Sequence, residues 1–105
     1  MTAAGADIIV AHMGLTTSGA IGAQSAKTLP QCVNDVQAII DTCKSLRQDV
    51  FVLCHGGPIA TPADAAFMFA QCRHLDGFYG ASSMERLPTE TAITQEIRKF
   101  TALDL

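Results

Sequence analysis

The sequence predicts an α/β domain in which three short parallel strands alternate with three helices. Apolar runs containing β-branched or aromatic residues recur at 7–14, 49–55 and 75–79. The first ends at Gly14, and glycine follows the other two. A stretch with apolar residues at helical spacing comes after each run. Strands that alternate with amphipathic helices, about 30 residues per unit, form parallel sheets with right-handed crossovers. The predicted order of elements is therefore βαβαβα.

The first strand is expected at 7–14, where the run is apolar enough for a strand buried on both faces. Residues 3–7 ahead of it have the pattern of a helix end closed by a glycine cap at Gly5. Three parallel strands would also leave two unpaired edges, which soluble proteins avoid or cover. We therefore expect these residues to belong to a larger architecture. A piece of a closed barrel and a small open sheet both fit the pattern.

The first helix is expected from Thr28 to about Arg47. Thr28 and Gln31 have the spacing of a capping box, and Pro30 lies in the first turn. One face of this helix is apolar, with Leu29, Cys32, Val33, Val36, Ile39, Ile40, Cys43 and Leu46.

The second and third helices have weaker but similar signals. Thr61 is the expected N-cap of the second helix, with Pro62 at its first position and Asp64 at its third. Its packed side should carry Ala65, Met68, Phe69 and Cys72. The last helix follows Pro88 and has apolar residues at helical spacing, namely Ile93, Ile97, Phe100 and Leu103.

Composition sets the class of protein. The chain has 105 residues, 49% of them hydrophobic and 16% charged, with a net charge of −3. This excludes intrinsic disorder, gives no electrostatic footprint for nucleic acid, and fits one domain over 1–105. No apolar run approaches the roughly 18 residues of a membrane span, and no signal peptide is visible. This apolar content is high for so short a chain. We therefore expect its apolar faces to be covered, either in a homo-oligomer or by the remainder of a barrel.

The four cysteines lie at 32, 43, 54 and 72, and none forms a C-x-x-C pair. This spacing argues against a structural zinc site, and no residue of the chain is predicted as a metal ligand. Buried free thiols in a reducing, cytoplasmic setting are expected.

Chemistry is expected where the strands end, because ligands of parallel α/β proteins bind at the carboxyl ends of the strands. His12 and His55 each close a predicted strand, and both are candidates for proton transfer. The alternative for each is a structural histidine that donates to a backbone carbonyl. His74, at the end of a helix, is expected to be solvated.

Small and hydroxyl residues after the strands predict an anion site. Backbone N–H groups and hydroxyls of such segments bind phosphate or carboxylate, and the residues concerned are Gly56, Gly57, Gly80, Ser82 and Ser83. The alternative is that the glycines only permit tight turns.

Three further groups of candidates surround the predicted anion site. Arg86 is a candidate clamp for an anionic group, and Glu85 is either its ion-pair partner or a base. Thr16 and Thr17 are expected to contact substrate from a loop after the first strand.

The stretches 7–17 (DIIVAHMGLTT), 54–59 (CHGGPI) and 77–88 (GFYGASSMERLP) resemble the C-terminal part of the phosphoenolpyruvate hydrolase-like TIM-barrel family, also described as TIM-barrel signal-transduction proteins with an indole-glycerol-phosphate-synthase-like barrel. The resemblance covers essentially the whole chain. It implies that the three strands are the sixth, seventh and eighth of a (β/α)8 barrel, so that the chain is a partial barrel.

The resemblance implies an enzyme that acts on phosphoenolpyruvate or a similar small phosphorylated or oxo-acid metabolite, by hydrolysis or lyase-type chemistry. The sequence names no cofactor, and a divalent metal would need ligands from outside this chain. The alternatives are a ligand-binding or regulatory barrel without catalysis, and a truncated, inactive gene product.

Overall fold

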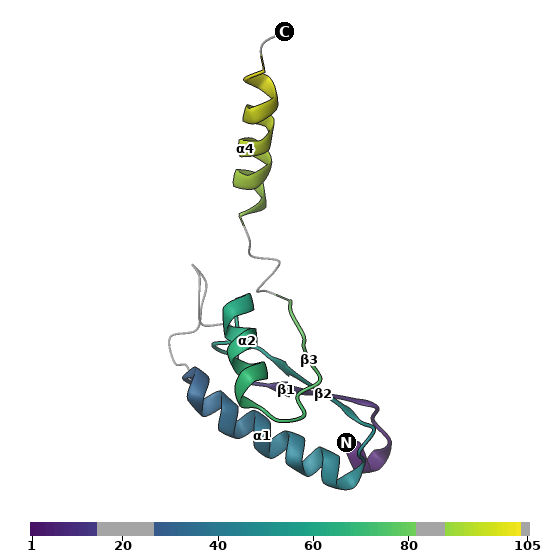
Figure 1. The fold of residues 1–105 in the computed structure, drawn as a ribbon. Helices are drawn as coiled ribbons and strands as arrows, with labels where there is room; N and C mark the ends of the chain where they lie inside the picture. The colour runs from purple at the N-terminus through teal and green to yellow at the C-terminus, as the bar shows by residue number, and fades with distance from the viewer. Residues whose placement is uncertain (15–26, 82–87, 104–105) are drawn as a thin grey trace.

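The computed structural model describes residues 1–14, 27–81 and 88–103 (Figure 1). These residues form a 3₁₀ turn, three strands and three helices: η1 (Thr2–Ala4), β1 (Ile8–His12), α1 (Leu29–Leu46), β2 (Phe51–His55), α2 (Pro62–Gln71), β3 (Gly77–Phe78) and α4 (Thr89–Thr101). The predicted α/β class and order of elements are confirmed, with strands shorter than their apolar runs.

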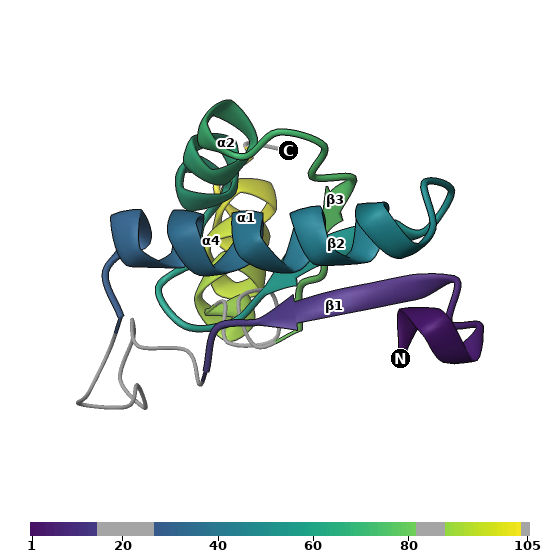
Figure 2. The ribbon, with the colours of Figure 1, turned by 90° about the horizontal axis from the view of Figure 1, so that it is seen from below.

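The sheet is parallel and follows chain order, β1-β2-β3. Ile8 is level with Phe51, His12 with His55, and Cys54 with Phe78. Helix α1 runs along β1 and β2 (Figure 2). Because the register brings the carboxyl ends of β1 and β2 level, the residues that follow the two strands are neighbours in space.

The predicted capping box at the start of α1 and the predicted N-cap Thr61 of α2 are both present. The Gln31 backbone N–H donates to Thr28 Oγ1 and the Thr28 N–H donates to Gln31 Oε1, which fixes the start of α1. The same reciprocal pair joins Thr61 and Asp64 at the start of α2. Each box pairs backbone donors that a helix start otherwise leaves without intrahelical partners. The predicted N-terminal glycine cap is also found, at Gly5 with φ 98°.

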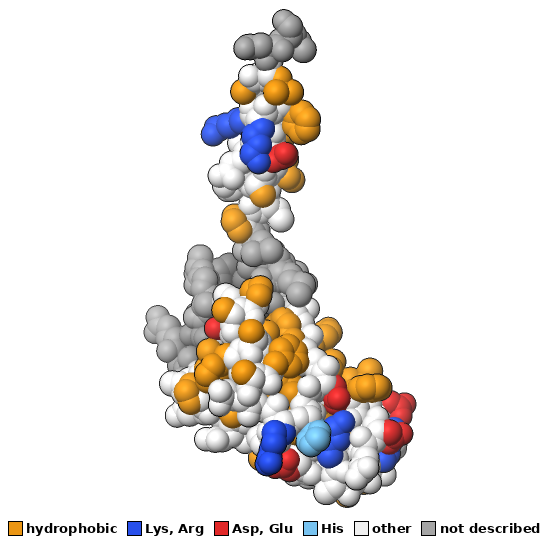
Figure 3. All heavy atoms as spheres, viewed as in Figure 1, with side chains coloured by type: hydrophobic (Ala, Val, Ile, Leu, Met, Phe, Trp, Pro, Cys, Tyr) orange, Lys and Arg blue, Asp and Glu red, His pale blue; other side chains and the backbone are white. Residues whose placement is uncertain are grey.

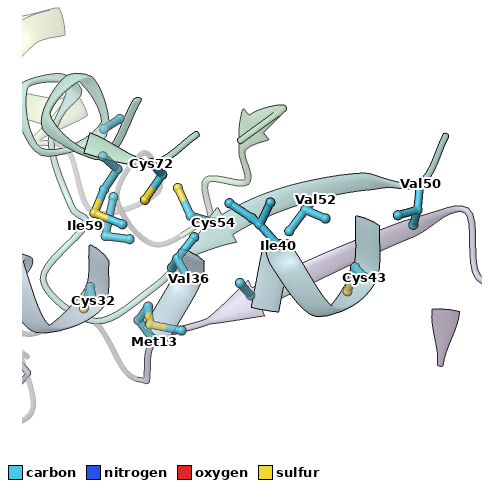
Figure 4. Packing of buried hydrophobic residues seen from close by; sticks show 13 residues of the cluster. Met13, Cys32, Val36, Ile40, Cys43, Val50, Val52, Cys54, Ile59 and Cys72 are labelled. Carbon is cyan, nitrogen blue, oxygen red and sulfur yellow. The ribbon is translucent and has the colours of Figure 1, made fainter. Parts of the chain in front are cut away.

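The core lies between the sheet and its two helices (Figure 4). Alternate residues of the strands face α1 and α2, and the fully buried side chains include Val36, Ile40, Val52 and Met68. All four cysteines are buried and free, as the sequence predicts. Phe69, expected on the packed side of α2, is instead 45% exposed.

Burial should make the core thiols unreactive. Cys54 has no exposed surface, and burial raises the pKa of its thiol to about 11, so the nucleophilic thiolate is scarce near neutral pH. We expect iodoacetamide at pH 8 to modify Cys54 only after denaturation. A cysteine introduced at the exposed Ser45 is the control and should react at once. Equal modification rates at both positions, measured by mass spectrometry, would contradict this burial.

One face of the sheet has no covering element among the described residues. Ile8 and Phe51 are each 57% exposed and Val10 is 40% exposed. The expectation that the first strand is buried on both faces is therefore wrong for the described structure, because α1 and α2 pack on the same side. We call Ile8, Val10 and Phe51 the open apolar face.

Helix α4 is amphipathic, but no residue of it is buried. Apolar side chains gather along it in Figure 3, and those predicted for its packed face are Ile93, Ile97, Phe100 and Leu103, all more than half exposed. The predicted helix is confirmed, and its apolar face has no cover within the described part of the chain. No helix formed by the described residues is both long and apolar enough to span a membrane.

Asp76, just before β3, connects β3 to β2 and α1. Its Oδ2 accepts hydrogen bonds from the Val52 backbone N–H at 2.8 Å and from Lys44 Nζ at 3.0 Å, and the same ammonium donates to the Val50 carbonyl. Burial raises the pKa of Asp76, but the bonds from Val52 and Lys44 outweigh it and hold this pKa below its ordinary value.

Replacing Asp76 by alanine should lower the free energy of unfolding by about 2 kcal/mol, because the Val52 N–H and Lys44 lose a charged acceptor. Since the folded pKa is lowered, the contribution is complete above pH 4 or so and is lost as the pH falls through the folded value. Urea denaturation at pH 7 and pH 3 tests this. Asp49→Ala, at an exposed ion pair with Arg47, should change little.

Candidate functional site at the carboxyl ends of the strands

Side chains from all three strand ends meet at one edge of the sheet. The His12 and His55 rings have centroids 4.8 Å apart, edge to face at 78°. On its other side, His55 meets the ring of Tyr79, with centroids 5.0 Å apart at 67°. The structure thus brings together the two histidines that the sequence predicts and adds a tyrosine that was not among the predicted site residues.

The pleat of the sheet explains this meeting. Successive side chains of a strand alternate between faces, so His12 lies on the same side as Ile8 and Val10. The register pairs His12 with His55 and Cys54 with Phe78, which places Tyr79 beside His55. The three rings therefore stand at the carboxyl end of the open apolar face. Tyr79 could not be predicted from the sequence, because its position beside His55 depends on the pairing of β3 with β2.

Backbone groups select opposite tautomers for the neutral forms of the two imidazoles. The Gly14 N–H donates to His12 Nδ1 at 3.0 Å, and since an amide only donates, this nitrogen has no proton. His55 Nδ1 lies 2.5 Å from the Tyr79 carbonyl oxygen, which only accepts, so this nitrogen donates its proton. In the neutral rings, His12 carries its proton on Nε2, and His55 has a lone pair there.

Gly56 and Gly57 let β1 and β2 approach closely beyond the strand ends. Their φ angles are 78° and 61°, and an added Cβ would strike the Gly14 carbonyl at Gly56 or the Met13 carbonyl at Gly57. The Gly57 N–H donates to the Gly14 carbonyl at 2.8 Å. This conformation fits the alternative that the glycines serve the turn. Anion binding by Gly56 and Gly57 stays a prediction, with the Gly57 amide already engaged.

Several predicted residues lie outside the described residues, namely Thr16, Thr17, Ser82, Ser83, Glu85 and Arg86. Gly80 is described and directly follows Tyr79, half-buried beside the histidine site. The roles assigned to all of these residues from the sequence remain predictions. His74 is exposed with φ 61°. It lies between α2 and β3, ahead of the amino end of β3, whereas His12 and His55 lie at the carboxyl ends of their strands.

Within the described ranges, no three histidine, cysteine, aspartate or glutamate side chains gather closely enough to hold a metal ion. His12 and His55 close β1 and β2. In each ring the backbone hydrogen bond uses Nδ1, and Nε2 has no part in it. The described residues therefore supply proton donors and acceptors to this edge of the sheet.

A parallel α/β sheet with ionisable side chains converging at its carboxyl edge is the arrangement of proteins that bind or convert small molecules there. A comparison with known families identifies the family of the chain. The family model described as phosphoenolpyruvate hydrolase-like matches residues 1–103, and the chain belongs to this family. The resemblance found in the three motifs is thereby confirmed.

Three curated relatives are similar to the chain. The "ToMV susceptible protein tm-1(GCR26)" and the "ToMV resistance protein Tm-1(GCR237)", both from Solanum lycopersicum, are each 53% identical over all 105 residues, which is 14% of their own length. The "Putative transcriptional regulatory protein y4pA" of Sinorhizobium fredii is 28% identical over 97 residues, covering 92% of this chain and 16% of the relative. The chain therefore spans a small part of the relatives that it matches.

Proposed function

We propose that residues 1–105 form the last three βα units of a (β/α)8 barrel that converts a small phosphorylated or oxo-acid metabolite, such as phosphoenolpyruvate, by hydrolysis or lyase-type chemistry. The observation that carries the proposal is the contact of His12, His55 and Tyr79 at the carboxyl ends of three neighbouring parallel strands. Active sites of such barrels lie at this end of the strands.

The sheet supports the barrel architecture in two ways. Its strands are adjacent in chain order, as strands of a (β/α)8 barrel are. Its helices α1 and α2 pack on one face, and the other is the open apolar face, where side chains that fill a barrel interior would lie. The missing strands would come from the rest of a longer polypeptide, and a homo-oligomer is the alternative source of cover.

The proposed site divides binding from proton transfer. Ser82, Ser83, Gly80 and the Gly56 amide would bind the anionic group, with Arg86 as a cationic clamp, and Thr16 and Thr17 would contact the substrate. The two histidines would transfer protons to and from the substrate. Four buried free thiols fit a reducing compartment, and a cytoplasmic location is part of this proposal.

The test is turnover by the full-length protein with phosphoenolpyruvate and a panel of 2-oxo acids. His55→Ala should lower kcat by about 10²- to 10⁴-fold, the usual contribution of a positioned acid or base. Arg86→Ala should mainly raise KM. His74→Asn is the matched control, because asparagine tolerates the positive φ of this exposed histidine. Unchanged kcat/KM in both His55→Ala and Arg86→Ala would overturn the proposed site.

A regulatory barrel that binds the same class of ligand without converting it is the second candidate. The names of the relatives favour it, since one refers to transcriptional regulation and the others to ToMV resistance and susceptibility. Calorimetric titration separates the two candidates: saturable binding of phosphoenolpyruvate or an oxo acid, with no product formed over hours, favours the regulatory barrel.

A further inference from the structure

We propose that the histidine pair performs enolisation: His55 removes a proton from the carbon next to a carbonyl group, and His12 stabilises the resulting enolate oxygen as a neutral hydrogen-bond donor. This inference rests on the proposed function and narrows its substrates to 2-oxo acids with an acidic C3–H bond. It follows from the opposite tautomers that Gly14 and Tyr79 impose on two rings in contact.

His55 is suited to accept a proton. Its Nδ1–H donates to the Tyr79 carbonyl at 2.5 Å, which leaves the Nε2 lone pair as the basic site of the neutral ring. When Nε2 takes a proton, the ring becomes a cation that still donates from Nδ1 to the same carbonyl. The hydrogen bond thus persists, and is strengthened, in the protonated form.

His12 is suited to donate and not to accept. Its Nδ1 must stay unprotonated to receive the Gly14 N–H at 3.0 Å, and its proton is therefore on Nε2. Protonation of Nδ1 would place two donors against each other and remove this bond. A neutral imidazole with a fixed N–H is an effective electrophile toward a carbonyl oxygen that gains negative charge.

The chemical step balances between these two rings and the substrate. The C3–H bond breaks, and its proton goes to His55 Nε2. The electron pair of that bond forms the C2–C3 double bond, and the carbonyl π pair moves to oxygen, where the His12 Nε2–H donates to it. Return of a proton from His55, after exchange with water, regenerates the oxo acid with a solvent hydrogen at C3.

The tautomers can be tested by a measurement that does not depend on enzymatic activity. Histidine-selective ¹⁵N labelling of the full-length protein and long-range ¹H–¹⁵N correlation spectra distinguish the two neutral forms, with His12→Gln and His55→Gln used for assignment. We expect the Nε2–H form at His12 and the Nδ1–H form at His55. The same tautomer at both positions would overturn the inference while leaving the proposed function untouched.

The step itself is tested by deuterium exchange into C3 of pyruvate in D₂O, catalysed by the full-length protein and compared with buffer alone. His12→Ala and His55→Ala should each lower the exchange rate by about 100-fold or more. Glutamine should restore part of the rate at position 12, where it supplies an N–H donor, and none at position 55, where a proton must be carried.

The outcomes separate this inference from the proposed function. Exchange with the expected pattern of glutamine rescue supports both. Turnover of phosphoenolpyruvate that depends on His55 but proceeds with no C3 exchange in pyruvate overturns enolisation and keeps the catalytic barrel. Rescue by glutamine at position 55 and not at position 12 overturns the assignment of roles.

Discussion

Replacing Gly57 by alanine is expected to lower the free energy of unfolding by about 3 kcal/mol and to disturb the histidine pair. Gly57 has φ 61°, which disfavours any residue with a Cβ, and the added Cβ would lie 2.5 Å from the Met13 carbonyl oxygen. Backbone must then move. The displaced segment includes Gly14, whose carbonyl accepts from Gly57 and whose N–H fixes the His12 ring.

Gly5→Ala is the matched control, because Gly5 also has a positive φ of 98° but nothing lies within 4 Å of its added Cβ. It should show only the conformational penalty, about 1 kcal/mol, and leave the histidine tautomers unchanged. Urea denaturation of both variants, with the ¹⁵N histidine spectra, measures the two effects. Equal destabilisation in both variants would show that the close approach at Gly57 contributes nothing.

Truncation of Ile40 to alanine is expected to destabilise the domain by about 2–5 kcal/mol, the range for aliphatic side chains removed from a packed core. Ile40 is fully buried on α1, in the same cluster as Val52 of β2 and Met68 of α2. A cavity there weakens the contact of the first helix with the sheet. The expected readout is a lower urea midpoint with an unchanged slope.

Leu46→Ala provides the comparison, since Leu46 lies on the same helix but is 58% exposed. Its truncation removes a similar side chain without opening a cavity and should cost much less than Ile40→Ala. Equal losses of stability in the two variants would contradict the placement of Ile40 in the packed core.

Elements defined by local chemistry were predictable from the sequence. The capping residues Thr28 and Thr61 mark the starts of α1 and α2, because each cap bonds within its own turn. The strands were predicted at the right places but too long. The third, expected over 75–79, is reduced to Gly77–Phe78 because its bounds depend on pairing with β2 and not on its own apolar run.

His12 and His55 were predicted as candidate residues, but Tyr79 and the arrangement of the three rings were not. His12 and His55 are visible as residues that close apolar runs, but their contact requires the register between β1 and β2. The opposite tautomers depend on the Gly14 N–H and the Tyr79 carbonyl, and the pattern of side chains in the sequence does not predict these backbone contacts. The exposure of Ile8 and Phe51 was likewise unpredictable, since an apolar strand has the same sequence whether or not a neighbour covers it.

His12, His55 and Tyr79 stand on the same side of the sheet as Ile8, Val10 and Phe51. Whatever covers those apolar side chains will also set how much water reaches the imidazoles, and hence the local dielectric constant in which they work. Hydrogen bonds and developing charges are worth far more where water is excluded. The reactivity that we propose for the pair should therefore rise when these apolar side chains are covered.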